Sequence, residues 1–303
     1  MTVRTYDSPA AFKEALEHRI RARTPKGTIV ARTRQLLVFD RFLARIVEVF
    51  GDAATVKGGI ALELRIDRAR TTKDVDLRLM GPSDDVLARL QRAARHDLGD
   101  FMVYEIVPDA EHPEIEAEGM KYEGRRFRAE CRLAGKIYGQ RFGVDIVFGD
   151  PFFGEPESLV AEDVLGFAGI APPTLRVYPL ETHIAEKLHA YTLPRKHPNS
   201  RIKDLPDLGL LAGSRSIDAV RLCGALEQTF AFRATHKIPL ALPEPPAAWK
   251  EPYAALARDE QLTWPTLQEV FAAAREFLDP VLAGKAGLTW DPGTWAWSAE
   301  AQP

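Results

Sequence analysis

The stretch that most clearly suggests chemistry is VKGGIALELRIDRARTTKDVDLRL, which runs from residue 56 to residue 79. It contains two aspartates, Asp74 and Asp76, one residue apart in a strand-like run. On a strand both carboxylates would project from the same face, because side chains alternate between the two faces. Two carboxylates this close repel each other unless a cation compensates, and Mg²⁺ prefers such oxygen ligands. The pair predicts a metal site; the alternative is an exposed polar strand face that Lys73 and Arg78 neutralise.

Two glycines in the same stretch, Gly58 and Gly59, lie between a short strand-like segment and an apolar helical one. Backbone N–H groups at a helix N-terminus bind anions, and glycine lets a phosphate approach closely. Lys57 adds a cation beside them. We therefore expect Lys57, Gly58 and Gly59 to bind the phosphates of a nucleotide, although a plain tight turn would also use two glycines.

A third acid, Asp145, belongs to a strand expected over residues 140–148. The apolar residues Val144, Ile146 and Phe148 share one face of that strand, so Asp145 points the other way. Beside Asp74 and Asp76, a third carboxylate would let the site hold two metal ions, which activate an attacking hydroxyl and stabilise a leaving phosphate. A simple surface position is the alternative for Asp145.

The last chemical segment is THIAEKLHAYTLPRKHPNSRIKDLPDLGLLAG, which begins at residue 182. His183 and Lys187 would share a helix face, and a lysine in such an apolar run either snorkels to solvent or meets an anion. The proline of KDLPDL is tolerated only in a first helical turn, which predicts a helix with Asp204 as its N-cap. We expect Asp207 to pair with Lys187 or Arg201 inside a cleft.

Hydrophobic periodicity predicts the elements that would position these residues. Helices are expected at 9–22, 31–50, 60–65, 82–94, 181–193, 205–212, 216–230 and 265–283, and strands at 55–57, 73–79, 101–107, 125–133 and 140–148, with a hairpin at Gly135 and Lys136. Residues 158–170 resemble a connector, and the tryptophan-rich tail is expected to be packed onto the surface or loosely ordered. The fold class is therefore α/β (α+β), with a mixed sheet followed by a mostly helical C-terminal part.

Composition limits the classes of function. The 303 residues suffice for one large domain or two ordinary ones. No membrane partner, secretion signal or disulfide framework is expected, and two distant cysteines suit a cytoplasmic protein. Because the net charge is −3, a nucleic-acid partner would need a local basic patch. Two clusters are candidates: Arg19, Arg21, Arg23, Lys26, Arg32 and Arg34, and Arg195, Lys196, His197, Arg201 and Lys203.

Four separate elements together resemble the AbiEii/AbiGii nucleotidyltransferase toxins, which include the MenT-like toxins and belong to the DNA-polymerase-β-like superfamily. The chain shows RQLLVFDRFLARI followed by KGGIALELR, then RTTKDVDLRL, IAEKLHA with a following arginine, and KDLPDL. The resemblance implies an N-terminal helical extension at 1–30, a polymerase-β-like nucleotidyltransferase core at 31–155 and a helical domain at 156–303 that completes the cleft. It also implies transfer of a nucleoside monophosphate from an NTP with Mg²⁺, Mn²⁺ being the alternative. The acceptor would be the 3′ end of tRNA, translation would be blocked, and a cognate antitoxin would be the partner.

By position, the resemblance matches Asp74 and Asp76 to metal-binding acids and the two glycines to the phosphate turn. It matches Lys187 to a lysine that contacts the triphosphate, and Asp207 to the acid of the later motif. The wider superfamily usually has Gly-Ser at the turn, so a serine contact to phosphate is absent here, although Gly-Gly is usual in this branch. Two rivals stay open: transfer to a small molecule or protein, and a non-catalytic binding protein of the same fold.

Overall fold

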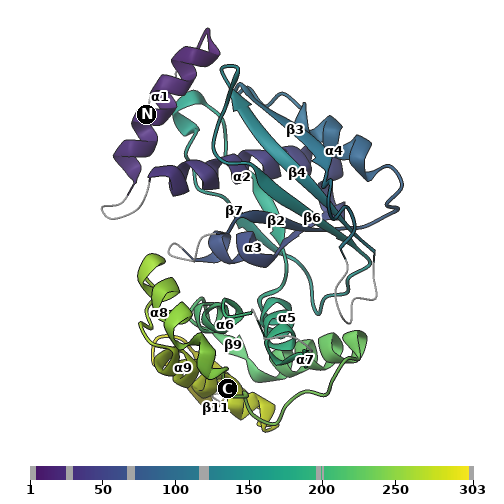
Figure 1. The fold of residues 1–303 in the computed structure, drawn as a ribbon, viewed down its shortest axis with the longest axis vertical. Helices are drawn as coiled ribbons and strands as arrows, with labels where there is room; N and C mark the ends of the chain where they lie inside the picture. The colour runs from purple at the N-terminus through teal and green to yellow at the C-terminus, as the bar shows by residue number, and fades with distance from the viewer. Residues whose placement is uncertain are drawn as a thin grey trace.

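Two hydrophobic cores divide the chain in the computed structural model, which describes residues 5–24, 30–66, 72–115, 123–195, 199 and 201–299. Side chains between residues 12 and 177 form the first core, and side chains between 180 and 290, joined by Leu62, form the second. The first part holds a large sheet with helices against it, and the second is mainly helical (Figure 1). The predicted mixed fold with a helical C-terminal part is confirmed.

The described residues of the first part include an eight-stranded mixed sheet in the order β3-β4-β6-β2-β1-β8-β7, with β5 paired to β4. Strands β2 and β6 run parallel, as do β1 and β8, and the other neighbours are antiparallel. The strands are β1 (Ala54–Lys57), β2 (Asp74–Leu79), β3 (Met102–Pro108), β4 (Gly124–Leu133), β5 (Lys136–Ile137), β6 (Phe142–Phe148), β7 (Glu157–Val160) and β8 (Thr174–Val177).

The helices of the first part are α1 (Pro9–Arg23), α2 (Val30–Phe50), α3 (Gly58–Arg65) and α4 (Val86–Ala94), with short 3₁₀ turns η1 (Gly51–Ala53) and η2 (Gly166–Ala168). The predicted two-sided pattern of β2 is confirmed, because its Val75, Leu77 and Leu79 are buried in the first core and its alternate residues are not. Burial of this apolar face fixes the register of the strand, since a one-residue slip would turn every side chain over.

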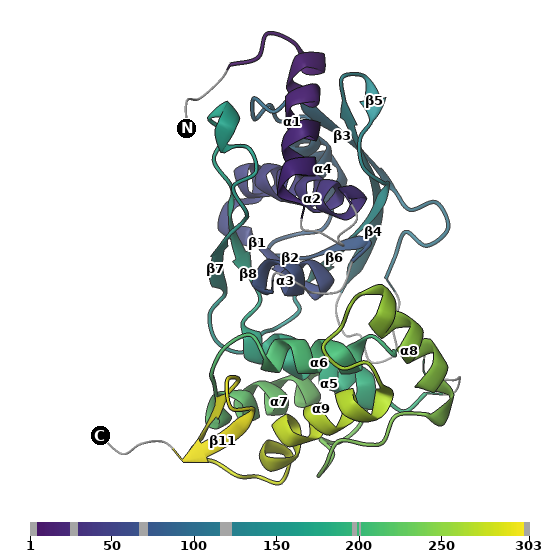
Figure 2. The ribbon, with the colours of Figure 1, turned by 90° about the vertical axis from the view of Figure 1, so that its left-hand side faces the viewer.

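The second part contains α5 (Leu180–Thr192), α6 (Asp204–Ala212), α7 (Ala219–Arg233), α8 (Lys250–Asp259) and α9 (Leu267–Leu282), with the turn η3 (Ala247–Trp249). A three-stranded sheet of β9 (Ile217–Asp218), β10 (Leu288–Asp291) and β11 (Ala296–Ala299) closes it. Helices α5 and α6 lie below α3 in both ribbon views (Figures 1 and 2). No described helix is long and apolar enough to cross a membrane.

Three expectations differ from the structure. Residues 158–170 are not only a connector, because residues 158–160 belong to β7, which pairs with β8 in the large sheet. The sheet thus extends past residue 155, and the proposed domain boundaries stay a prediction. Helix α8 was not expected. The tail is not loosely ordered over residues 288–299, because β10 pairs with β9 and β11 and its Trp290 is fully buried.

Candidate active site

The predicted metal carboxylates lie on the face of the large sheet opposite its core. Asp76 on β2 is the direct cross-strand neighbour of Asp145 on β6 and, on its other side, of Lys57 on β1. Asp74 is the neighbour of Gly143 on β6. Directly opposed side chains in a sheet lie about 5 Å apart at Cβ. The structure therefore brings Asp74, Asp76 and Asp145 together on one face, as the alternation predicted.

Asp76 is half-buried, and its surroundings disfavour the charged form of its carboxylate. Burial and the neighbouring Asp145 carboxylate raise the pKa of Asp76 to about 6, while the positive charges of Lys57 and Lys187 oppose the rise. Lys187 belongs to α5 in the second part of the molecule. Its charge acts on a carboxylate of the sheet, so the two parts contribute to one electrostatic site.

The two predicted glycines lie where the chain leaves β1 and enters α3. Gly58 has φ +64°, and a Cβ added there would overlap Asp76 Oδ2. A Cβ on Gly59 would lie 2.6 Å from Thr72 Oγ1. The backbone of the turn is therefore packed directly against Asp76 on β2 and against Thr72 just before that strand. Only glycine permits that approach. No side-chain hydrogen bond caps the described first turn of α3.

Lys57 lies beside the aspartates, but its ammonium group turns toward other acids. It forms ion pairs with Asp150 and, at 3.0 Å, with Glu186 of α5, and it lies 4.7 Å from the centre of the Tyr178 ring. The Tyr178 hydroxyl donates to Asp150 at 2.9 Å, and Arg233 of α7 lies 3.2 Å from Glu186. Lys57 thus joins the two parts of the molecule, and its direct contact with phosphate stays a prediction.

Lys187 is held by two buried carboxylates. Its Nζ lies 2.7 Å from Asp207 Oδ2 and 3.0 Å from Asp204 Oδ1. The predicted pairing of Lys187 with Asp207 is confirmed. The prediction of Asp204 as N-cap is wrong: α6 includes Asp204, Lys203 is its N-cap, and no side chain caps it. A buried aspartate gains more from a charged partner than from a backbone N–H.

His183 lies one turn before Lys187 and is buried beside it. Burial, together with the nearby charges of Lys187 and Arg65, lowers the pKa of His183 well below its usual range. Neither ring nitrogen has a hydrogen-bond partner among the described residues. The ring is neutral, and its shared environment with Lys187 agrees with the helix face expected from their spacing.

Asp74 and Asp76 fit a hard divalent cation better than Asp145 does. The Gly143 N–H donates to one oxygen of Asp74 at 3.2 Å, and no described residue forms an ion pair with Asp76. Both oxygens of Asp145 instead accept hydrogen bonds from Arg126 at 2.8 Å. The described residues contain no group of three or more acids, histidines or cysteines arranged for a metal. Mg²⁺ commonly uses only one or two carboxylates plus substrate phosphates, and Asp145 as a ligand stays a prediction.

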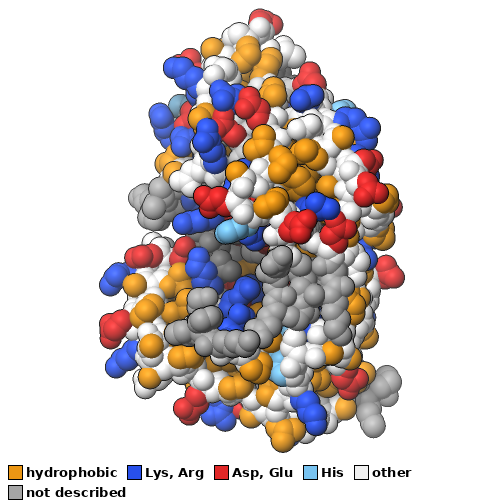
Figure 3. All heavy atoms as spheres, turned by 45° about the vertical axis from the view of Figure 1, so that its right-hand side comes forward, with side chains coloured by type: hydrophobic (Ala, Val, Ile, Leu, Met, Phe, Trp, Pro, Cys, Tyr) orange, Lys and Arg blue, Asp and Glu red, His pale blue; other side chains and the backbone are white. Residues whose placement is uncertain are grey.

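The first predicted basic cluster is largely neutralised. Arg34 pairs with Glu17 at 2.7 Å and Arg32 with Glu63 at 3.2 Å. Three more contact acids or a ring: Arg19, Arg21 and Arg23. Lys26, Lys196 and His197 lie outside the described residues. Lys and Arg side chains also gather in the recess between the two parts (Figure 3).

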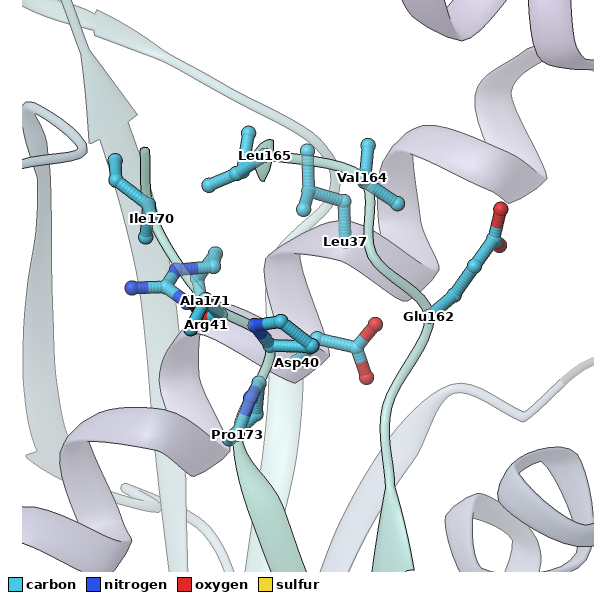
Figure 4. A pocket seen from close by; sticks show the side chains of 10 residues that line it. Leu37, Asp40, Arg41, Glu162, Val164, Leu165, Ile170, Ala171 and Pro173 are labelled. Carbon is cyan, nitrogen blue, oxygen red and sulfur yellow. Dashed lines mark hydrogen bonds between the residues drawn. The ribbon is translucent and has the colours of Figure 1, made fainter. Parts of the chain in front are cut away.

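A small pocket lies away from this site, between α2 and the segment 162–173 (Figure 4). Its polar groups are Asp40, Arg41 and Glu162. Burial raises the pKa of Asp40 to about 7, and the Glu162 carboxylate adds to the rise. None of the predicted site residues lines this pocket, so we treat it as a feature of stability.

Most of the chain matches one known protein family. A family model described as "Nucleotidyl transferase AbiEii toxin, Type IV TA system" matches residues 41–273. The chain belongs to the AbiEii nucleotidyltransferase toxin family. This match spans the glycine turn, the aspartate strand and the Lys187–Asp207 pair, so the resemblance in sequence is confirmed. No curated protein sequence matches the chain.

Three solved structures are similar to this AbiEii-family protein to different degrees. MenT4, a nucleotidyltransferase toxin from Mycobacterium tuberculosis H37Rv, superposes with a TM-score of 0.58 at 17% identity, covering 93% of this chain and 92% of its own. JHP933 from Helicobacter pylori gives 0.41 at 18% identity over 66% and 80% of the two chains. A putative nucleotidyltransferase from H. pylori gives 0.40 at 18% over 67% and 84%. Only the MenT4 likeness is close enough to show a shared fold.

Several residues of the site were not expected from the sequence. Arg126 lies on the polar face of a strand that was predicted correctly, so pairing that strand with the next one would have placed it opposite Asp145. Glu186 directly precedes Lys187, but a single acid on a helix carries no signal of a partner on β1. Asp150 and Arg233 come together only through the packing of the two parts.

Proposed function

We propose that this AbiEii-family chain is a divalent-cation-dependent nucleotidyltransferase that moves a nucleoside monophosphate from an NTP to the 3′ end of tRNA. The modified tRNA would no longer support translation, and a cognate antitoxin would restrain the toxin. One observation carries the proposal. The strand that carries Asp74 and Asp76 lies directly against the Gly58 turn at the start of α3.

Asp74 and Asp76 would hold the cation, Mg²⁺ or alternatively Mn²⁺. The bound cation supplies Lewis acidity: it lowers the pKa of the acceptor hydroxyl and polarises the α-phosphate. Burial and the adjacent Asp145 carboxylate disfavour the charged form of Asp76 and raise its pKa, and a bound cation would favour that charged form. Asp145 would join them if it left Arg126.

The nucleotide would lie between the sheet and α5. Gly58 and Gly59 bring the start of α3 directly against Asp76 and Thr72. The first N–H groups of α3 have no side-chain cap there and would favour an anion. The Lys187 ammonium would neutralise charge on the triphosphate, and Asp207 would fix its position. Lys57 would add positive charge beside the turn while staying bound to Asp150 and Glu186.

Transfer to RNA is supported by the family and by the positive side chains in the recess of Figure 3. Phosphate backbones are attracted by such charge. The first rival, a small-molecule or protein acceptor, would use the same cation and nucleotide. The second rival, a non-catalytic binder, is disfavoured because Asp74, Asp76, Lys187 and Asp207 are all present.

An acceptor panel tests the proposal. The full chain is incubated with each α-labelled NTP and either total RNA, a small-molecule panel or a protein extract, with Asp76→Asn as the matched control. We expect label on the tRNA band only, with none in the control or after chelation of divalent cations. Label on a small molecule or protein would refute the RNA acceptor. Absence of both label and Mg²⁺-dependent NTP binding by calorimetry would favour the non-catalytic rival.

A further inference from the structure

Arg126 on β4 is the side chain that occupies the carboxylate of Asp145. Its Nε and one terminal nitrogen each donate to a different carboxylate oxygen of Asp145, both at 2.8 Å. This two-point geometry is the strongest form of an arginine–carboxylate pair. The two side chains are 31% and 20% exposed, so solvent and ions can still reach the pair. The contact is therefore firm but open to competition.

The pair belongs to a row of charges that crosses four adjacent strands. In order along the row stand Lys57 on β1, Asp76 on β2, Asp145 on β6 and Arg126 on β4. Two carboxylates thus lie side by side between two cations. The Lys57 ammonium forms its ion pairs with Asp150 and Glu186. Among the four described residues of the row, only Arg126 forms an ion pair with one of the central carboxylates.

The two central carboxylates are consequently in different states. Asp145 has both oxygens occupied, whereas no described residue forms an ion pair with Asp76. A divalent cation that entered at Asp74 and Asp76 would lie next to Asp145, because Asp145 is the direct neighbour of Asp76. The guanidinium group and the cation would then compete for the same carboxylate.

We propose that Arg126 is a positioning residue that occupies Asp145 until a divalent cation binds and then gives the carboxylate up to it. This inference rests on the proposed function, because it assumes that the aspartates bind a cation. A doubly charged ion at bonding distance competes for the carboxylate with the arginine, because the pair is partly exposed to solvent.

A reversible pair has an advantage both before and after the cation binds. Without Arg126, two adjacent uncompensated carboxylates would repel each other in the cation-free protein. If Arg126 stayed bound to Asp145, the cation would have only Asp74 and Asp76 as carboxylate ligands. Release of the guanidinium also frees a planar group with a fork that suits phosphate oxygens. A purely structural clamp between β4 and β6 would bring neither effect, and cation binding distinguishes the two roles.

The test measures Mn²⁺ binding to the full chain by electron paramagnetic resonance, without nucleotide or acceptor. Arg126→Ala should bind Mn²⁺ about fivefold more tightly than the unmodified chain, because the competitor is gone. Arg128→Ala is the matched control: Arg128 lies on the same face of β4 two residues on and pairs with Asp109 at 2.6 Å. We expect the control to bind Mn²⁺ as the unmodified chain does.

Asp145→Asn should weaken Mn²⁺ binding, and adding Arg126→Ala to it should change nothing more, because the shared carboxylate is gone. Arg126→Lys keeps the charge without the fork, and should fall between the unmodified chain and Arg126→Ala if the latter proves unstable. Unchanged or weaker binding in Arg126→Ala and Arg126→Lys would overturn the inference. Nucleotidyl transfer with unchanged cation affinity in these variants would refute only the role of Arg126. The expected affinities without any transfer would refute only the proposed function.

Discussion

At the scale of single residues, Asp76 is the point on which the site depends. It lies between the Asp145 carboxylate and the Lys57 side chain in the sheet, and the turn of Gly58 presses against it from one side. Its raised pKa shows that the protein alone does not fully compensate its charge. A bound cation would complete that compensation. The close approach of the turn then brings substrate phosphates next to the ion.

Replacing Gly58 with alanine tests this close approach. The new Cβ would overlap the Asp76 carboxylate, and the positive φ would strain the alanine as well. We expect at least a roughly tenfold loss of Mg²⁺-dependent NTP affinity by calorimetry. Gly51→Ala is the control, because Gly51 also has a positive φ but an added Cβ meets nothing within 4 Å. Both variants should lose about 1 kcal/mol of stability. Equal NTP affinity in the two variants would contradict the role of the turn.

At the scale of elements, α5 and α6 together fix the position of one ammonium group, that of Lys187. Lys187 on α5 meets two acids from the first turn of α6, Asp204 and Asp207. Both acids are buried, so each would be costly without its partner. The two helices therefore fix Lys187 in one position facing the sheet.

Asp204→Asn distinguishes a partner of Lys187 from a helix cap. Asparagine caps helices as well as aspartate does, so a capping role predicts almost no change. A charged partner of Lys187 predicts a loss of about 1–2 kcal/mol in the free energy of unfolding, measured by urea denaturation. Asp218→Asn is the control, because Asp218 is a true N-cap that accepts from Arg221 N–H at 2.7 Å. Equal effects of the two substitutions would contradict the pairing.

Elements with a local pattern were predictable, and those defined by partners were not. The alternating apolar residues of β2 and β6 gave the correct faces for Asp76 and Asp145 because those apolar residues are buried in the first core. Strand β8 follows two prolines and pairs with β1 in parallel, a contact between distant segments with no local signature. Helix α8 carries a proline in its first turn, which is tolerated there but reads as a break.

The same difference separates the site residues that were found from those that were missed. Asp74 and Asp76 share a two-residue spacing, and Lys187 interrupts an apolar helix, so each leaves a mark in its own segment. Arg126 and Glu186 matter because of what lies opposite them in the folded chain. Asp204 was misread as a cap because the sequence shows its place at the helix start but not Lys187 beside it.

At the scale of the whole molecule, the site is a junction between two cores. The sheet supplies Asp74 and Asp76, the helical part supplies Lys187 and Asp207, and the ion pairs of Lys57 with Asp150 and Glu186 bridge the junction. Under the proposed function, side chains of both parts would have to be in place for the cation, the triphosphate and the acceptor to meet. Neither core alone contains a complete set of these groups.

Stability of the whole molecule should depend on pH through Asp40, far from the site. Its pKa is raised to about 7 in the folded state, against about 3.9 when unfolded. Between these values the folded chain binds more protons, so the stability falls as pH rises and the full cost is reached above about pH 7. Asp40→Asn should therefore stabilise the protein by a few kcal/mol, up to about 4, near pH 8 and have little effect near pH 4.

Thermal unfolding at the two pH values checks this expectation, with Asp84→Asn as the control because Asp84 is an exposed acid. The control should change nothing at either pH. An equal effect of Asp40→Asn at both pH values would contradict the assignment of the penalty to ionisation of Asp40.

The most direct measurement is a comparison of α-labelled and γ-labelled NTP incubated with tRNA, Mg²⁺ and the full chain. Transfer of a nucleoside monophosphate places the α-label on the RNA and leaves the γ-label in pyrophosphate. We predict α-label on tRNA, no γ-label, and a loss of about a hundredfold or more in Asp76→Asn. Transfer of the γ-label, or α-transfer that survives in Asp76→Asn, would contradict the account of this site.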